Sequence, residues 1–136
     1  MIEVKVTSDP RFLIIVRAML GRLCELLEFP EEEQRKIVLA VDEACANIIT
    51  HTYQGDCSQT IDILCRGSGE QLEVVLQDCG PPVDFSRVMP RNLEDLRPGG
   101  LGTHFIRSIM DEVQYSHREG GGNVLRMVKN LHKPCQ

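Results

Sequence analysis

Three short groups of polar residues and glycines follow one another along the chain and together could bind a nucleotide. They are Glu43, Asn47 and His51; then Asp78 and Gly80; then Gly100, Leu101, Gly102 and Thr103. A carboxylate can act as a base, an amide oxygen can ligate Mg²⁺, and a strand-end carboxylate can accept a hydrogen bond from an exocyclic amine. Glycines at a helix start let backbone amides approach phosphate oxygens. Each group is common alone, but the ordered combination predicts an ATP site.

The first group is expected on a helix that begins at Pro30. Proline suits the first turn of a helix, and the carboxylates of 31–33 favour its positive end. The predicted buried stripe of this helix consists of Ile37, Val41, Ala44, Cys45 and Ile48. Steps of four residues advance by roughly 40° on a helix, so Glu43, Asn47 and His51 should follow a band beside that stripe. The band can line a pocket, although it can equally be the polar rim of an amphipathic helix.

The second group closes a predicted β-hairpin. The segments 60–66 and 71–78 alternate or are apolar, and the turn-rich residues 67–70 between them have hairpin length. Asp78 then stands at the end of a strand, where Gly80 and two prolines turn the chain away. Aspartate and glycine are also ordinary turn residues, so the functional interpretation of this group depends on the other two.

A long segment without periodicity separates the second group from the third. It runs from Pro81 to Pro98 and contains four prolines. Long loops inside small domains are usually disordered or functional, and the position between two candidate binding groups favours a lid over the nucleotide. The glycine-rich group should then open a helix over 104–110.

The other segments complete the predicted fold. Strands are expected at 2–7, 113–117 and 123–130, and a helix from about Asp9 to Glu28. The residues of that helix expected to pack on the core are Phe12, Ile15, Val16, Met19, Leu20, Leu23 and Leu27. These elements predict an α/β (α+β) two-layer sandwich, in which helices cover one face of a mixed, mostly antiparallel sheet.

Length, composition and charge limit which kinds of protein this chain can be. With 136 residues and 42% hydrophobic content, we expect a single domain over 1–136. A net charge of −5 and 4% aromatic residues argue against direct binding of nucleic acid or of an anionic membrane surface. No apolar run approaches the roughly 18 to 20 residues of a spanning helix, and the start lacks the apolar core of a signal peptide, so we expect a cytoplasmic protein.

The chain has six cysteines and no CxxC pair. Several lie within apolar patterns, so we expect reduced thiols that behave as small buried hydrophobic groups. A zinc site on Cys45, His51 and Cys57 is the alternative, but this spacing matches no common ligand pattern.

The order and spacing of the three groups resemble the GHKL ATPase superfamily, shared by gyrase-type ATPases, MutL-type repair proteins and histidine kinases, over nearly the whole chain. Within this superfamily, the chain resembles the anti-sigma-factor serine kinases of bacteria in particular. The motifs that carry this resemblance are Glu43-x-x-x-Asn47-x-x-x-His51, Asp78-x-Gly80 and Gly100-Leu101-Gly102. The resemblance implies a Bergerat-type ATP-binding fold and an ATP- and Mg²⁺-dependent serine/threonine protein kinase. Such a kinase phosphorylates a small anti-sigma-factor antagonist, can sequester a sigma factor, and is expected to form a homodimer.

The resemblance also implies how the nucleotide would be held. Asn47 would hold Mg²⁺ through its side-chain oxygen, Asp78 would recognise the adenine amine, and Gly80 would let the base lie close to the backbone. The residues that would cradle the phosphates are Gly100, Leu101, Gly102 and Thr103. Glu43 would orient or deprotonate the serine hydroxyl of a partner protein, and His51 would support the site.

Two positions depart from the superfamily pattern. Pro82 stands where many members continue the strand-end motif as Asp-x-Gly-x-Gly, and proline supplies neither the backbone freedom nor an amide donor. Asn123 follows Gly122 where a threonine often reaches toward the nucleotide. Two other functions stay open. One is a binding module that associates with partners under nucleotide control and transfers little phosphate. The other is the detached catalytic domain of a histidine kinase, which the short lid and the lack of a phospho-accepting helical hairpin in this sequence disfavour.

Overall fold

The computed structural model describes residues 1–85 and 100–131, and for residues 100–103 it describes the backbone alone. In chain order the elements are β1 (Ile2–Thr7), the 3₁₀ turn η1 (Pro10–Phe12), α1 (Leu13–Leu26), α2 (Glu31–Asn47), the π-helix η2 (Ile48–Thr52), β2 (Thr60–Gly67), β3 (Gln71–Asp78), α4 (Gly100–Ile109), β4 (Glu112–His117) and β5 (Asn123–Asn130). Most of the predicted lid lies outside the described residues. None of the helices in these described residues combines the length and the apolar character of a membrane-spanning segment.

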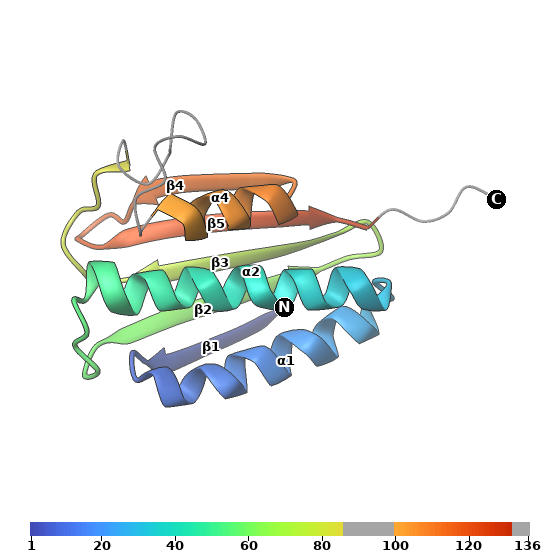
Figure 1. Ribbon diagram of the computed structural model, residues 1–136, viewed down its shortest axis with the longest axis horizontal. Helices are drawn as coiled ribbons and strands as arrows, with labels where there is room; N and C mark the ends of the chain where they lie inside the picture. The colour runs from blue at the N-terminus through green and yellow to red at the C-terminus, as the bar shows by residue number, and fades with distance from the viewer. Residues whose placement is uncertain (86–99, 132–136) are drawn as a thin grey trace.

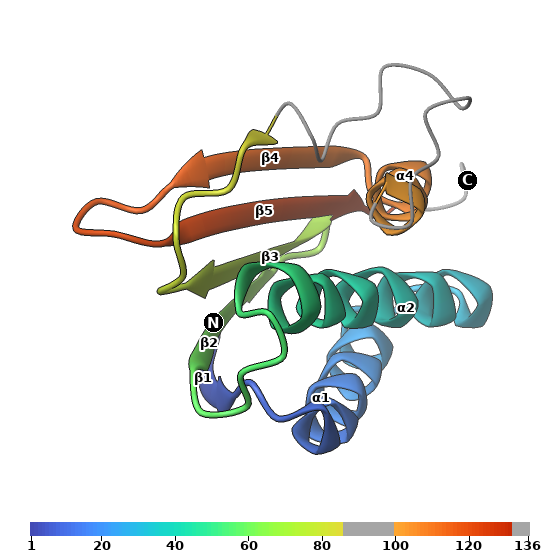
Figure 2. The same cartoon turned by 60° about the vertical axis from the view of Figure 1, so that its left-hand side comes forward.

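The five strands form one sheet in the order β1-β2-β3-β5-β4. The helices α1, α2 and α4 cover the same face of this sheet (Figure 1, Figure 2). The predicted two-layer α/β fold is confirmed. The sheet was expected to be mixed, mostly antiparallel, whereas all of its described pairings are antiparallel. Hairpins join β2 to β3 and β4 to β5, and the connection that contains α1 and α2 joins β1 to its antiparallel neighbour β2.

Strand β3 places a carboxylate on the helix-covered face of the sheet. Side chains alternate along a strand, and Leu72, Val74 and Leu76 point into the core, each 1% exposed. Asp78 continues this row and is 3% exposed. Its carboxylate therefore stands at the end of the sheet on the side of the helices.

Helix α1 packs on the core with a set of residues that only partly matches the predicted stripe. The buried residues are Leu13, Val16, Leu20 and Cys24. Phe12 and Ile15 were expected in the core but are 46% and 56% exposed. Phe12 belongs to the 3₁₀ turn η1, which Asp9 caps and Pro10 begins, and not to α1. Ile15 lies within α1 but is turned away from its buried residues, because it follows Leu13 by two residues, a rotation of roughly 200°.

Three of the described cysteines, Cys24, Cys45 and Cys65, are buried free thiols, as expected. Burial raises the pKa of Cys24 and Cys45 to about 12 and that of Cys65 to about 11, so these thiols are protonated at neutral pH. Cys57 and Cys79 are exposed free thiols in turns, so the expectation of buried groups is wrong for these two. The sixth, at position 135, lies outside the described residues.

Candidate functional site

The three groups of residues identified in the sequence converge at one end of the fold. Helix α2 ends at Asn47, strand β3 ends at Asp78, and helix α4 begins at Gly100. These three ends all lie toward the left in Figure 1. Helix α4 also packs beside α2 on the same face of the sheet. Polar groups from distant parts of the sequence are therefore brought to one region at the edge of the core.

Glu43 and Asn47 lie one turn apart near the end of α2. The predicted buried stripe of this helix is confirmed, because Ile37, Val41, Ala44, Cys45 and Ile48 are at most 7% exposed. Glu43 and Asn47 border the stripe and are half-buried. Neither side chain makes a hydrogen bond or ion pair with another described residue. Both polar groups are consequently open to an external ligand.

His51 lies in the π-helix η2, which follows α2. There the amide of Tyr53 donates to the carbonyl of Ile48 at 2.8 Å, five residues back. His51 is exposed, whereas Glu43 and Asn47 are half-buried. Its supporting role stays a prediction.

Asp78 is held by three hydrogen bonds to one of its two carboxylate oxygens. Oδ1 accepts from the Gly80 amide at 2.9 Å, from the Asn123 amide at 3.2 Å and from Asn123 Nδ2 at 2.9 Å. No hydrogen bond from a described residue reaches Oδ2. The carboxylate is therefore fixed in orientation and keeps one oxygen that can accept a hydrogen bond from a ligand.

The chain that follows Asp78 is packed tightly against η2. A Cβ atom added at Gly80 would collide with Thr52 Cγ2, so a glycine is needed here for packing within the protein. The Cys79 amide donates to the Tyr53 hydroxyl at 2.8 Å, and this hydroxyl donates to the carbonyl of Thr60. Burial raises the pKa of Tyr53 above its usual value. That the adenine base of a nucleotide lies close to the Gly80 backbone stays a prediction.

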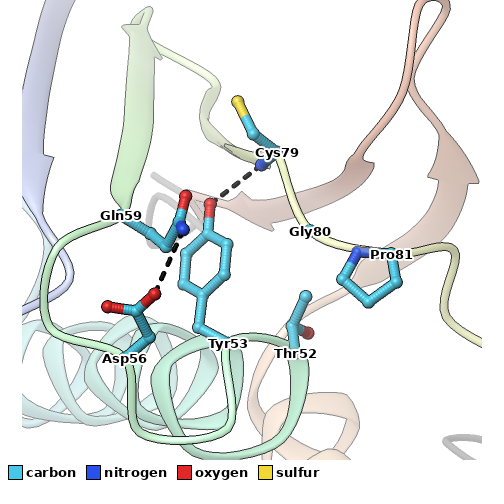
Figure 3. Close-up of a pocket in the computed structure, with 7 residues that line it drawn as sticks. All are labelled: Thr52, Tyr53, Asp56, Gln59, Cys79, Gly80 and Pro81. Atoms are coloured by element: carbon cyan, nitrogen blue, oxygen red, sulfur yellow. Dashed lines mark hydrogen bonds between the residues drawn. The ribbon is translucent and has the colours of Figure 1, made fainter.

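A pocket of about 190 Å³ lies between η2 and residues 79–81 (Figure 3). Its lining consists of Thr52, Tyr53, Asp56, Gln59, Cys79, Gly80 and Pro81. Glu43, Asn47 and Asp78 do not contribute to it. The pocket is therefore separate from the predicted catalytic and metal-binding side chains.

The glycine-rich group begins helix α4, which runs from Gly100 to Ile109. Ile106 and Ile109 are buried and hold the helix on the core. The first N–H groups of a helix have no partner within it and attract anions. The side chains of Leu101 and Thr103 lie outside the described residues, so the phosphate contacts of Gly100, Leu101, Gly102 and Thr103 stay predictions.

Two residues that the sequence analysis did not assign to the site contribute to its geometry. Tyr53 supports the turn after β3, and Asn123, only 5% exposed, contacts the carboxylate of Asp78. The neighbouring Gly122 has a φ of 110°, and a Cβ atom there would collide with the carbonyl oxygen of Asp78. The sequence analysis noted Asn123 only because the resemblance to the GHKL superfamily led us to expect a threonine there.

Comparison with curated proteins gives matches over nearly the whole chain. Residues 6–129 match the family model of the histidine kinase-like ATPase domain. The chain is 28% identical over 127 residues to the serine-protein kinase RsbW of Bacillus subtilis (strain 168), covering 88% of this chain and 79% of that protein. It is 30% identical over 127 residues to the serine-protein kinase RsbW of Bacillus cereus (strain Q1), with coverage of 88% and 79%.

Solved structures share the fold. The RsbU and RsbW domains of a Mycobacterium tuberculosis protein match with a TM-score of 0.65 and 17% identity, covering 100% of this chain and 34% of that chain. This chain thus spans about a third of that structure. The catalytic domain of histidine kinase ThkA matches with a TM-score of 0.60 and 15% identity, covering 96% of this chain and 98% of that chain. At these identities the likeness concerns the fold alone.

Proposed function

The chain belongs to the histidine kinase-like ATPase family, and we propose that it is an ATP- and Mg²⁺-dependent serine/threonine protein kinase. One observation carries the proposal. A buried carboxylate with one open oxygen, two half-buried polar side chains without partners among the described residues, and the start of a helix all lie at the same end of the fold. The curated relatives named as serine-protein kinases support the same activity.

The available donors and acceptors suit an adenine nucleotide. Asp78 Oδ2 would accept a hydrogen bond from the exocyclic amine of adenine, since Oδ1 is already occupied by three donors. The backbone amides of residues 100–103 at the start of α4 would bind the phosphates. The side-chain oxygen of Asn47 would hold Mg²⁺, an ion that neutralises the negative charge of the phosphates.

Glu43 is the proposed catalytic base. The oxygen of a serine hydroxyl on the partner protein would form a bond to the γ-phosphorus of ATP, the bond from that phosphorus to the ADP oxygen would break, and the hydroxyl proton would pass to the Glu43 carboxylate. Because no described cation pairs with Glu43, its carboxylate is available to accept that proton. General bases contribute roughly 10²- to 10⁴-fold to a rate.

The proposed partner is a small anti-sigma-factor antagonist protein that carries the phosphorylated serine. Partner switching would then have the kinase release the phosphorylated antagonist and bind a sigma factor, acting as a homodimer in the cytoplasm. The net charge of −5 fits a protein that regulates transcription through protein partners and binds neither nucleic acid nor a membrane directly.

The test compares the unchanged protein with Glu43→Gln in two assays, calorimetric titration with Mg²⁺ and ATP, and transfer of the γ-phosphate to a purified anti-sigma-factor antagonist. Glutamine has nearly the same shape as glutamate but cannot take up the proton. Glu43→Gln should bind ATP with nearly unchanged affinity and lose at least about 100-fold in transfer rate. Glu70→Gln, in the exposed turn between β2 and β3, is the matched control and should retain both properties.

Each outcome separates the candidate functions. Transfer that survives Glu43→Gln would remove Glu43 from the mechanism. ATP binding by the unchanged protein without transfer to any antagonist would favour the alternative, a binding module under nucleotide control. Loss of ATP binding in Glu43→Gln would show that this side chain holds the nucleotide instead of acting as a base.

A further inference from the structure

We propose that Asn123 is a positioning residue for nucleotide selection, which acts by holding the Asp78 carboxylate and the diproline turn together. The inference rests on the proposed function, because it concerns the carboxylate that would recognise adenine. It goes beyond that function by assigning a role to Asn123, which contacts Asp78, and by connecting this role with the backbone on both sides of Pro82.

The side-chain amide of Asn123 joins the Asp78 carboxylate to the backbone of Pro81 and Val83. Nδ2 donates to Asp78 Oδ1 at 2.9 Å and to the Pro81 carbonyl at 2.9 Å, and Oδ1 accepts from the Val83 amide at 2.9 Å. This pattern fixes the orientation of the amide, since the reverse orientation would place its oxygen against a carboxylate and a carbonyl. Asn123 therefore connects the end of β3 with both sides of Pro82.

The diproline sequence explains why such a connection is needed. Pro81 and Pro82 have no N–H groups, so this stretch of backbone cannot form the hydrogen bonds that a glycine-containing turn would make. The nearest polar backbone groups around Pro82 are the Pro81 carbonyl and the Val83 amide, and Asn123 satisfies both. A threonine hydroxyl has a single donor and is too short a group to replace these contacts together. The side chain of Asn123 thus compensates for the N–H groups that the two prolines lack.

The hydrogen bonds of Asn123 also indicate that it does not contact the ligand itself. Both N–H bonds of its side chain and its backbone N–H are directed to atoms of the protein, and the residue is 5% exposed. No donor remains for a nucleotide. Asn123 consequently acts through Asp78: it occupies Oδ1 and leaves Oδ2 as the one oxygen of this carboxylate that can accept from an exocyclic amine.

The experiment measures the affinities of ATP and inosine 5′-triphosphate for the full chain by calorimetric titration with Mg²⁺. Inosine has an oxygen in place of the exocyclic amine, so the ratio of the two affinities reports the contact made by Asp78. Asn123→Thr should weaken ATP binding by about tenfold while changing inosine triphosphate binding by less than about twofold. Asn123→Ser should have the same direction of effect and covers the case in which the threonine variant does not fold.

Asn130→Thr is the matched control, because it changes asparagine at the exposed, opposite end of β5. It should leave the affinity ratio unchanged. Hydrogen exchange of the Val83 amide provides an independent check and should accelerate in both Asn123 variants but not in the control.

The results distinguish the inference from the function on which it rests. Equal weakening of both nucleotides in a folded Asn123 variant, or an unchanged ratio with faster exchange at Val83, would overturn the positioning role alone. Absence of ATP binding by the unchanged protein would overturn the proposed function and the inference with it.

Discussion

Replacing Asp78 by asparagine should weaken ATP binding in a way that the local geometry specifies. Three N–H groups converge on Oδ1, from Gly80 and twice from Asn123. The oxygen of an asparagine amide must take this position, because an NH₂ group there would face three donors. The amide nitrogen is then forced into the position of Oδ2 and presents a donor to the donor amine of adenine.

The magnitude follows from the lost contact. A hydrogen bond to an ionised group contributes about 1.5–3 kcal/mol, which corresponds to a roughly 10- to 150-fold loss of ATP affinity. The fold should persist, since the three donors keep an acceptor. Calorimetric titration with Mg²⁺ and ATP measures the affinity, and thermal unfolding checks the fold.

The control for this substitution is Asp111→Asn, which changes an exposed carboxylate that follows α4 and accepts the Asn130 amide at 2.6 Å. It should leave ATP affinity unchanged. An Asp78→Asn protein that is folded and binds ATP as tightly as the unchanged protein would refute the assignment of Asp78 to adenine.

Three further predictions concern the turns and thiols around the site. Gly122→Ala should lower the free energy of unfolding by at least about 1–3 kcal/mol, because φ at Gly122 is 110° and a Cβ there would collide with the carbonyl oxygen of Asp78. The control Gly21→Ala, in the open middle of α1, should instead raise the free energy of unfolding by about 0.5–1 kcal/mol. Urea unfolding that ranks the two variants the other way would contradict the backbone geometry. Tyr53→Phe should cost about 1–3 kcal/mol in the same measurement, because it leaves the Cys79 amide without its acceptor; no change in the urea midpoint would mean that water replaces the hydroxyl. Of the described cysteines, Cys57 and Cys79 should react with a thiol reagent in the folded protein, while the three buried thiols, with pKa values of about 11 to 12, should react only after unfolding. Rapid labelling of a buried cysteine in native protein would show that the core opens.

Much of the fold could be predicted because local patterns and tertiary structure agree. Strands β3 and β5 have the predicted bounds, and β2 extends one residue beyond its prediction. Alternation along β3 also predicts which face carries Asp78, because the strand period of two is fixed by the backbone. The resemblance to the histidine kinase-like ATPase family is confirmed by the family match over residues 6–129.

Some features that escaped prediction depend on how the helices begin, end and face the core. Phe12 belongs to a 3₁₀ turn and Ile15 lies on the outer side of α1, so both are exposed, and α2 is followed by a π-helix that contains His51. A pattern search that assumes one α-helical period finds neither the 3₁₀ turn nor the π-helix.

The contact of Asn123 with Asp78 joins residues 45 positions apart. Sequence spacing carries no direct signal for such a contact. The family pattern marked Asn123 as unusual, but only the hydrogen bonds around it indicate what the amide does. The predicted lid at 81–98 lies largely outside the described residues and stays a prediction.

Binding of Mg²⁺ and ATP at one end of this fold can be tested by mapping amide chemical shifts by nuclear magnetic resonance during titration with a non-hydrolysable ATP analogue and Mg²⁺. We expect the largest shifts at Asn47, at Asp78 to Gly80 and at residues 100–103, and none at the turn 67–70 at the far end of β2 and β3. Shifts concentrated away from these three segments, or no shifts at saturating analogue, would contradict it.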